Sequence, residues 1–123
     1  MVTTPVLFDT CILIDYLNAV PQARVECDRH SDRAISIISW MELLVGTDSA
    51  VEYEVRKFLL NFKVVPLTPA VAERAVVIRR GSRLKLPDAI IKATSEEDGR
   101  VLVTRNTRDF PAGSAGTQVP YTV

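Results

Sequence analysis

Short apolar runs alternate along this chain with longer segments in which apolar residues recur at the spacing of an amphipathic helix. Four runs predict buried β-strands, at Val6–Phe8, Ala34–Ile38, Lys63–Leu67 and Val101–Val103. Helical periodicity follows the first run over Cys11–Asn18. A loop containing proline, glycine and serine at Pro111–Gly116 precedes a short edge strand that we expect at Val119–Val123.

Other helices in the first half of the chain are marked by residues that favour helix ends. A proline suits the first turn of a helix over Pro21–Asp28. An S-x-x-E pattern predicts the start of the next helix, with Ser39 as the N-cap and Glu42 as its capping partner. The same pattern at Ser49–Glu52 predicts a further helix that reaches Phe62.

Proline and glycine frame two helices in the second half of the chain. Thr68 and Pro69 supply an N-cap hydroxyl and a first-turn proline, and Gly81 ends that helix. Pro87 opens a helix that runs through Glu97. Strands that alternate with helices predict an α/β fold, a three-layer sandwich around a mainly parallel central sheet. With 123 residues, the chain is expected to form a single domain over residues 1–123.

Composition narrows the classes of protein to which the chain can belong. Apolar residues make up 47% of the chain and charged residues 24%, as in ordinary globular domains and unlike disordered chains. The apolar runs are far shorter than a membrane span and no signal-peptide pattern opens the chain, so we expect a cytoplasmic protein without membrane contact. Cys11 and Cys27 are too few and too isolated for a disulfide framework or a zinc site.

Charge is balanced overall but uneven along the sequence. The 15 Lys and Arg residues equal the 15 Asp and Glu residues, which argues against a protein that coats nucleic acid non-specifically. Between Arg79 and Arg108, however, basic residues outnumber acidic ones. This segment is either a solvated surface or a phosphate-binding patch, and Lys92, Arg105 and Arg108 are its candidate phosphate contacts. Asp15, on the first helix, is expected to be solvated or ion-paired.

Four acidic residues lie where predicted strands end or predicted helices begin: Asp9, Glu42, Asp88 and Asp109. In a parallel α/β fold such positions can meet at the carboxyl edge of the sheet, where ligands bind. Clustered carboxylates repel and raise one another's pKa values unless a cation neutralises them. A ligand set made of oxygen atoms suits a hard ion such as Mg²⁺ or Mn²⁺. The pattern therefore favours a metal-dependent nuclease.

Each of these acids also has an ordinary structural explanation, which stays open. Asp9 can cap a helix, Glu42 fits the third position of a capping box, and Asp88 complements the dipole at a helix N-terminus. Asp109 taken alone is an unremarkable turn residue. His30 is the single histidine and lies in a segment expected at the surface, so a two-histidine ribonuclease mechanism is excluded.

Four stretches resemble a known family, and their order and separation follow it along the whole chain. They are LFDTCILIDYL (Leu7–Leu17), SWMELLVG (Ser39–Gly46), LKLPDAIIKATS (Leu84–Ser95) and LVTRNTRDF (Leu102–Phe110). They are similar to the corresponding stretches of PIN-domain ribonucleases, specifically the VapC-type toxins of toxin–antitoxin pairs. The last two stretches are the most specific.

This resemblance implies a PIN-like fold and an endoribonuclease activity that hydrolyses RNA phosphodiester bonds. The implied cofactor is Mg²⁺, for which Mn²⁺ can substitute. It assigns the catalytic carboxylates as Asp9, Glu42, Asp88 and Asp109, of which Asp9, Asp88 and Asp109 are metal ligands. Thr10 and Asn106 would orient ligands or water, and the three basic candidates would contact RNA. A VapB-like antitoxin and a homodimer are the implied partners. In some relatives an acid stands at the position of Asn106. Because an amide stands here, the number of bound metal ions, one or two, stays open.

Two other classes of function stay open. A phospho-accepting receiver domain has a similar length and an acidic Mg²⁺ pocket, but it needs adjacent acids after the first strand, where Phe8 precedes Asp9. It also needs an aspartate after a middle strand, and Lys63–Leu67 ends without one. A haloacid-dehalogenase-type phosphatase would need a second acid where Cys11 stands. The second class is a PIN-like domain that has kept its fold and serves only as a binding module.

Overall fold

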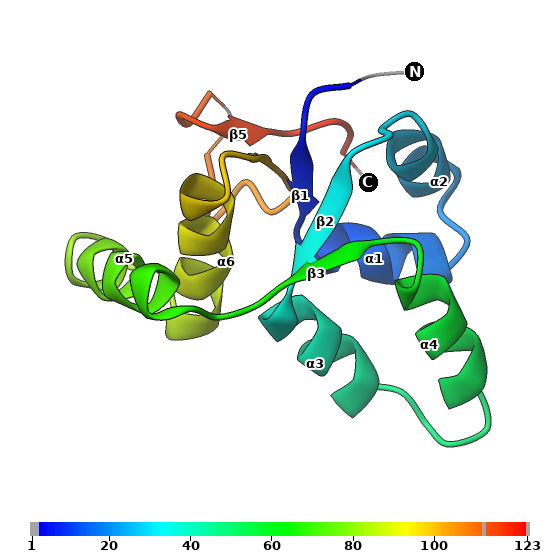
Figure 1. Ribbon diagram of the computed structural model, residues 1–123. Coiled ribbons are helices and arrows are strands. Elements are labelled where there is room, and N and C mark those ends of the chain that lie inside the picture. Colours follow the sequence, from blue (N-terminus) through cyan, green and yellow to red (C-terminus); the bar gives the residue numbers. More distant parts are fainter. Residues whose placement is uncertain (1–2, 112, 123) are drawn as a thin grey trace.

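The computed structural model describes residues 3–111 and 113–122, in which strands and helices alternate around a central sheet (Figure 1). The strands in these ranges are β1 (Val6–Phe8), β2 (Arg33–Ser36), β3 (Lys63–Val65), β4 (Val101–Val103) and β5 (Thr117–Gln118). The helices are α1 (Thr10–Leu17), α2 (Pro21–Asp28), α3 (Ile37–Val45), α4 (Glu52–Leu59), α5 (Pro69–Arg80) and α6 (Leu86–Glu97). Among these described helices, none is long and apolar enough to cross a membrane.

The strand pairs of the described sheet are all parallel, and the strands lie in the order β3-β2-β1-β4-β5. The prediction of a mainly parallel sheet is therefore confirmed. Because the strands run in one direction, the segments that follow β1, β2 and β4 emerge at the same edge. The Asp9 N–H donates to the Val103 carbonyl at 2.9 Å, which brings the end of β1 beside the end of β4.

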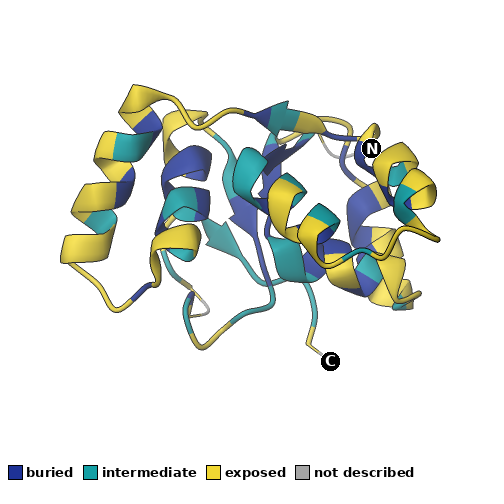
Figure 2. Cartoon of the chain, turned by 90° about the horizontal axis from the view of Figure 1, so that it is seen from below, coloured by how far each residue is buried: buried dark blue, intermediate teal, exposed yellow. Residues whose placement is uncertain are grey.

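Helices cover both faces of the sheet, so the fold is the predicted three-layer sandwich. Val6 and Phe8 point into a core shared with α1, α2, α3 and α4, whereas Leu7 points into a second core shared with α6. α5 packs against α6 through small residues that include Ala75 and Ala93. Figure 1 shows α5 and α6 on one side of the sheet and the other helices on the opposite side. Figure 2 shows that the helices are buried towards the sheet and exposed on their outer surfaces.

Several predicted helices are confirmed because their local end signals are used as expected. α2 spans Pro21–Asp28, as predicted. The Thr68 side chain accepts the Val71 N–H at 3.2 Å and caps α5, and Gly81 follows the last residue of that helix. α6 ends just before a turn in which Gly99 has a φ of +64°, a conformation that glycine adopts at little cost.

The predicted start of α3 is wrong. The N-cap is Ser36, whose side chain accepts the Ile38 N–H at 3.1 Å, and the helix begins with the next residue. Ser39 lies inside the helix with its side chain buried, and Glu42 lies beyond the first turn, so they do not form the predicted capping box. The pairing of β2 with β3 ends at Ser36, and this leaves the following isoleucines to the helix instead of the strand.

Other predicted boundaries also differ from the structure. α4 begins at Glu52 and no side chain caps it in the described chain, so Ser49 does not have its predicted capping role. β3 ends before Pro66, which has no N–H to donate to a neighbouring strand. The last described strand lies at Thr117–Gln118, before the predicted Val119–Val123, and the final residue of that predicted range lies outside the described residues.

His30 is buried, although its segment was expected at the surface. Its Nε2 lies 2.7 Å from Glu26 Oε2, and its ring packs edge-on against Phe8 with 5.7 Å between the ring centres. The neighbouring Asp28, Arg29 and Asp32 are exposed, whereas the imidazole packs against Phe8 of the central strand. The charge pattern alone therefore gave the wrong location.

Candidate active site

The carboxyl edge of the sheet collects the four predicted catalytic carboxylates from separate elements. Asp9 follows β1, Glu42 lies in α3, Asp88 lies in the first turn of α6, and Asp109 lies in the loop after β4. The charges of the other three acids all raise the pKa of Asp88, so they lie within electrostatic range of it. The strand order places β2, β1 and β4 side by side, and this brings the acids together.

Asp9 is the most deeply buried of these acids, with 4% of its surface exposed. Its Oδ1 accepts the Thr10 backbone N–H at 2.8 Å, which is the N-cap contact of α1. Its Oδ2 accepts the Thr104 hydroxyl at 2.7 Å. Burial raises the pKa of Asp9 above its usual value, although these donors act in the opposite direction. The capping role and a place in the acidic cluster are therefore compatible.

Asp88 has a clear electrostatic perturbation. Its pKa rises to about 6, first because the carboxyl group is buried and then because of the neighbouring carboxylates, with Asp9 the strongest of them. Lys85 acts in the opposite direction and only partly offsets these effects. A carboxyl group in such surroundings is costly to ionise, and a bound cation would remove that cost.

Glu42 is held by a chain of hydroxyl groups. The Thr10 hydroxyl lies 2.8 Å from Glu42 Oε1 and 2.8 Å from Ser39 Oγ. Thr10 is the donor in both contacts, so its single hydroxyl proton is shared between Glu42 and Ser39. Thr10 therefore links α1 to α3, and Ser39 supports this link from inside α3.

The loop after β4 presents Asp109 through a hydrogen-bonded turn. Asn106 Nδ2 donates to Asp109 Oδ2 at 2.8 Å, and the Phe110 N–H donates to the Asn106 carbonyl at 2.9 Å. The Asn106 N–H donates to the Thr104 hydroxyl at 3.0 Å. Asn106 thus orients a neighbouring carboxylate and adds no charge of its own.

Thr104 belongs to this site, although no sequence pattern singled it out. It is fully buried, and its hydroxyl contacts both Asp9 and the backbone of Asn106. A signal was present, since Thr104 directly follows β4 as Asp9 directly follows β1. The two strands are parallel neighbours, so residues at equivalent positions after them lie close together.

The donor chemistry of the cluster fits a hard divalent cation, although a complete ligand set is not yet in place. Within residues 3–111 and 113–122, no three carboxylate, imidazole or thiolate groups already converge on one point. Protein donors occupy oxygens of both Asp9 and Asp109. Mg²⁺ is commonly held by one or two carboxylates and several waters, so these carboxylates provide the kind of ligand that it needs.

The three basic residues predicted to contact RNA have different surroundings. Lys92 Nζ donates to the Ala115 carbonyl at 2.8 Å, and Arg105 forms a two-point ion pair with Asp15. Arg108 is exposed, and its guanidinium forms no hydrogen bond or ion pair within the described chain. A hollow of about 360 Å³ is lined by Cys11, Arg105, Asn106, Thr107, Arg108 and Asp109. Arg108 is therefore the candidate most available to a ligand.

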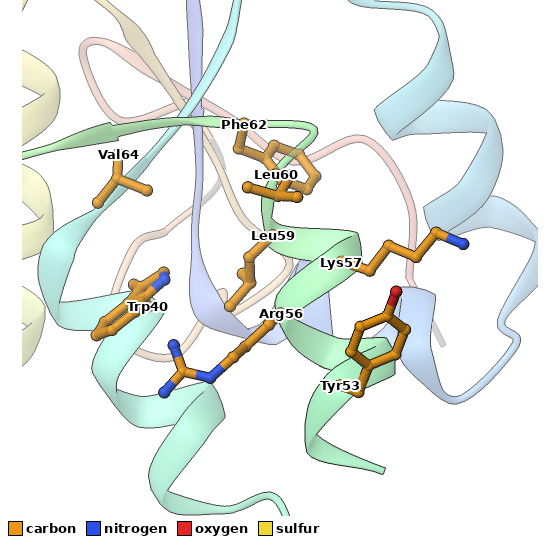
Figure 3. Close-up of a pocket in the computed structure, with 8 residues that line it drawn as sticks. All are labelled: Trp40, Tyr53, Arg56, Lys57, Leu59, Leu60, Phe62 and Val64. Atoms are coloured by element: carbon orange, nitrogen blue, oxygen red, sulfur yellow. The ribbon is translucent and has the colours of Figure 1, made fainter.

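A separate apolar cleft of about 690 Å³ opens between α3, α4 and β3 (Figure 3). Trp40 from α3 and Arg56 from α4 lie against each other in its wall, with the guanidinium carbon 5.5 Å from the centre of the indole ring. Leu60 at its rim is largely exposed. The cleft contains none of the predicted catalytic residues, so it is a surface distinct from the acidic cluster.

Comparison with known proteins relates this chain and its fold to one family. Residues 6–113 match the sequence profile of the family described as the PIN domain. Ribonuclease VapC10 from Mycobacterium tuberculosis is 34% identical over 86% of this chain and 86% of its own length.

Two solved structures are also similar over nearly the whole chain. One is described as a toxin–antitoxin complex from Klebsiella pneumoniae, with a TM-score of 0.89 and 41% identity over 96% of this chain and 99% of that chain. The other is FitAcB from Neisseria gonorrhoeae, with a TM-score of 0.79 over 96% of this chain and 99% of that chain. Its identity is 21%, so this second likeness supports the fold alone.

Proposed function

Because the chain belongs to the PIN domain family, we propose that it is a Mg²⁺-dependent endoribonuclease that acts as the toxin of a toxin–antitoxin pair. The observation that carries this proposal is the group of carboxylates at the sheet edge, in which the pKa of Asp88 rises to about 6. Similarity to Ribonuclease VapC10 supports RNA as the substrate. Family membership leaves no support for a receiver domain or a dehalogenase-type phosphatase.

In this proposal, Asp9 and Asp88 hold the metal ion, and Asp109 and Glu42 complete the site directly or through water. Mg²⁺, when bound, lowers the pKa of a water molecule and offsets the charge that develops on the phosphoryl oxygens. Asn106 adds no charge, and its amide is already bonded to Asp109, so we expect a single ion.

The hydrogen-bond partners of the carboxylates keep them in place for this reaction. Thr104 and the Thr10 N–H hold both oxygens of Asp9, which limits the directions in which it can bind a ligand. Glu42 is exposed and uses Oε1 to accept from Thr10. Because Oε2 forms no hydrogen bond with the described residues, it can take a proton from water. A phosphodiester bond is then broken by water that the carboxylate cluster orients.

The partner in this proposal is an antitoxin protein that closes the acidic cluster, as the similarity to the Klebsiella pneumoniae complex supports. An arm carrying Arg or Lys would pair with Asp9 or Asp88 and displace the metal ion. The apolar cleft between α3 and α4 suits a short amphipathic helix of the same partner, and Arg56 and Lys57 favour acidic residues on that helix. We also expect a homodimer, which light scattering would detect.

A cleavage assay on the purified chain tests the nuclease proposal. RNA should be cut with Mg²⁺ or Mn²⁺, and excess chelator should stop the reaction. Asp9→Asn and Asp88→Asn should each abolish cleavage while circular dichroism shows a retained fold. Glu73→Gln, at an exposed position of α5, is the matched control and should cleave normally. Full cleavage in chelator would exclude the metal mechanism, and a folded protein inactive with either metal would favour a binding module.

A growth assay tests the toxin proposal separately. The chain produced alone should arrest growth, and co-production of a small protein encoded directly upstream should restore it. If soluble wild-type chain is produced without harm and with no partner gene present, the toxin role is contradicted, whereas the nuclease proposal is unaffected.

A further inference from the structure

A two-point ion pair joins α1 to the loop that follows β4. Arg105 Nη2 donates to Asp15 Oδ1 at 2.9 Å, and Arg105 Nε donates to Asp15 Oδ2. The Tyr121 hydroxyl donates to the same Oδ2 at 3.0 Å, so the C-terminal segment completes the contact. Asp15 is 5% exposed, whereas the Arg105 side chain is 32% exposed. Arg105 holds the pKa of Asp15 below its usual value, so the pair is ionised at neutral pH.

The sequence position of Arg105 connects this ion pair to the active site. The residue before it, Thr104, donates to Asp9, and the residue after it, Asn106, donates to Asp109. The backbone at Arg105 therefore limits where both neighbouring side chains can point. Asp15 reaches this loop because α1 follows β1, and β1 is the strand beside β4.

We propose that Arg105 and Asp15 are a positioning pair that holds the loop Thr104–Phe110 against α1, and that Arg105 does not contact RNA. The inference rests on the proposed nuclease function. A guanidinium that already binds both oxygens of a buried carboxylate would leave that carboxylate without a cationic partner if it moved to a phosphate, which is unfavourable. Arg108 lies in the same loop and is exposed, so the phosphate contact belongs to Arg108.

Amide hydrogen exchange tests the positioning role without any catalytic step. Asp15→Asn keeps the size of the side chain and removes the charge that binds Arg105. Protection of the Asn106 and Phe110 amides, measured by NMR in metal-free protein, should fall by about 10-fold or more, whereas amides inside α5 should be unchanged. Unchanged protection at both loop amides would overturn the proposal, whether or not the chain cleaves RNA.

Steady-state cleavage of a short oligoribonucleotide separates positioning from RNA contact. Arg105→Ala and Asp15→Ala should each lower kcat by about 10- to 100-fold and leave the KM for RNA and its salt dependence unchanged. The double variant should be no slower than either single variant, because both remove the same contact. Arg108→Ala should instead raise KM and reduce the salt slope by about 0.7.

Two further variants keep this kinetic test decisive. Arg105→Lys keeps the charge but loses the two-point geometry, so it should lower kcat without raising KM even if Arg105→Ala does not fold. Arg74→Ala breaks an exposed ion pair to Glu97 at 3.1 Å, away from the loop, and should leave kcat unchanged. A raised KM and a smaller salt slope in the Arg105 variants, with no effect of Asp15→Ala, would overturn the proposal. A wild-type chain that cleaves no RNA would end the proposed function, while the exchange result would still decide the positioning role.

Discussion

Replacement of Asp88 by asparagine should make the metal-free protein more stable at neutral pH. Folding raises the pKa of Asp88 from 3.8 to about 6, first by burial and then through neighbouring carboxylates such as Asp9. The unfolded chain therefore releases this proton at a lower pH than the native protein does. Asparagine has a similar shape and carries no charge, so Asp88→Asn removes the cost of ionisation.

The size and pH range of this effect follow from the two pKa values. Because each pH unit corresponds to about 1.4 kcal/mol, a change from 3.8 to about 6 sets an upper limit of about 3 kcal/mol. Asp88 is only half-buried, and the substitution also removes a favourable interaction of its charge with the α6 N-terminus. We therefore expect the free energy of unfolding to rise by about 1–2 kcal/mol at pH 7. Because folding raises the pKa of Asp88, the protonated carboxyl group contributes its full stability to the wild type below pH 3.8. This contribution is lost as the pH rises through about 6.

Urea denaturation in chelator, followed by the fluorescence of the single Trp40, measures this difference from pH 4 to pH 8. The Asp88→Asn variant and the wild type should have similar free energies of unfolding at pH 4 and separate as the pH rises, with the variant more stable. Glu73→Gln, an exposed change in α5, should follow the wild type throughout. A variant that is equally or less stable than the wild type at pH 7 would refute the idea that ionisation of Asp88 destabilises the metal-free fold.

Three other predictions follow from the contacts of the site. Thr104→Val removes the donor to buried Asp9 and the acceptor of the Asn106 N–H, so it should lower kcat by about 10- to 100-fold and also lower the melting temperature, and a normal kcat would contradict its role. Ser36→Ala removes the α3 cap and should lower the free energy of unfolding by about 1 kcal/mol, as measured by urea denaturation. Ser39→Ala should instead mainly lower the rate of RNA cleavage, as measured by kinetics. Mg²⁺ at 100 times its Kd should stabilise the wild type by about 2.7 kcal/mol and Asp9→Asn much less, and equal stabilisation in thermal melts would place the metal elsewhere.

Most of the helices and strands could be predicted from the sequence, because their signals are local. Prolines at the starts of α2, α5 and α6 are compatible with a first helical turn whatever the rest of the chain does. The apolar runs of β1 and β4 are buried from both sides and needed no further context. The position of Asp9, directly after an apolar strand, likewise indicates the sheet edge without any tertiary contact.

The start of α3 shows where local signals become ambiguous. Ser36 and Ser39 can each cap a helix, and the isoleucines between them suit a strand or a helix equally. The structure selects Ser36 because β2 pairs with β3 only as far as that residue. A capping pattern is a property of a few residues, whereas the length of a strand depends on its neighbour in the sheet.

The side chains that support the carboxylates depend on how the strands pack together. The contacts of Thr104 with Asp9 and of Arg105 with Asp15 join segments far apart in the chain, and they exist because β4 lies beside β1. Hydrophobic periodicity determines which side of a strand is buried, but it does not determine which strand becomes its neighbour. Strand order depends on how all the helices and strands pack together, so these supporting contacts could not be predicted from any single stretch of sequence.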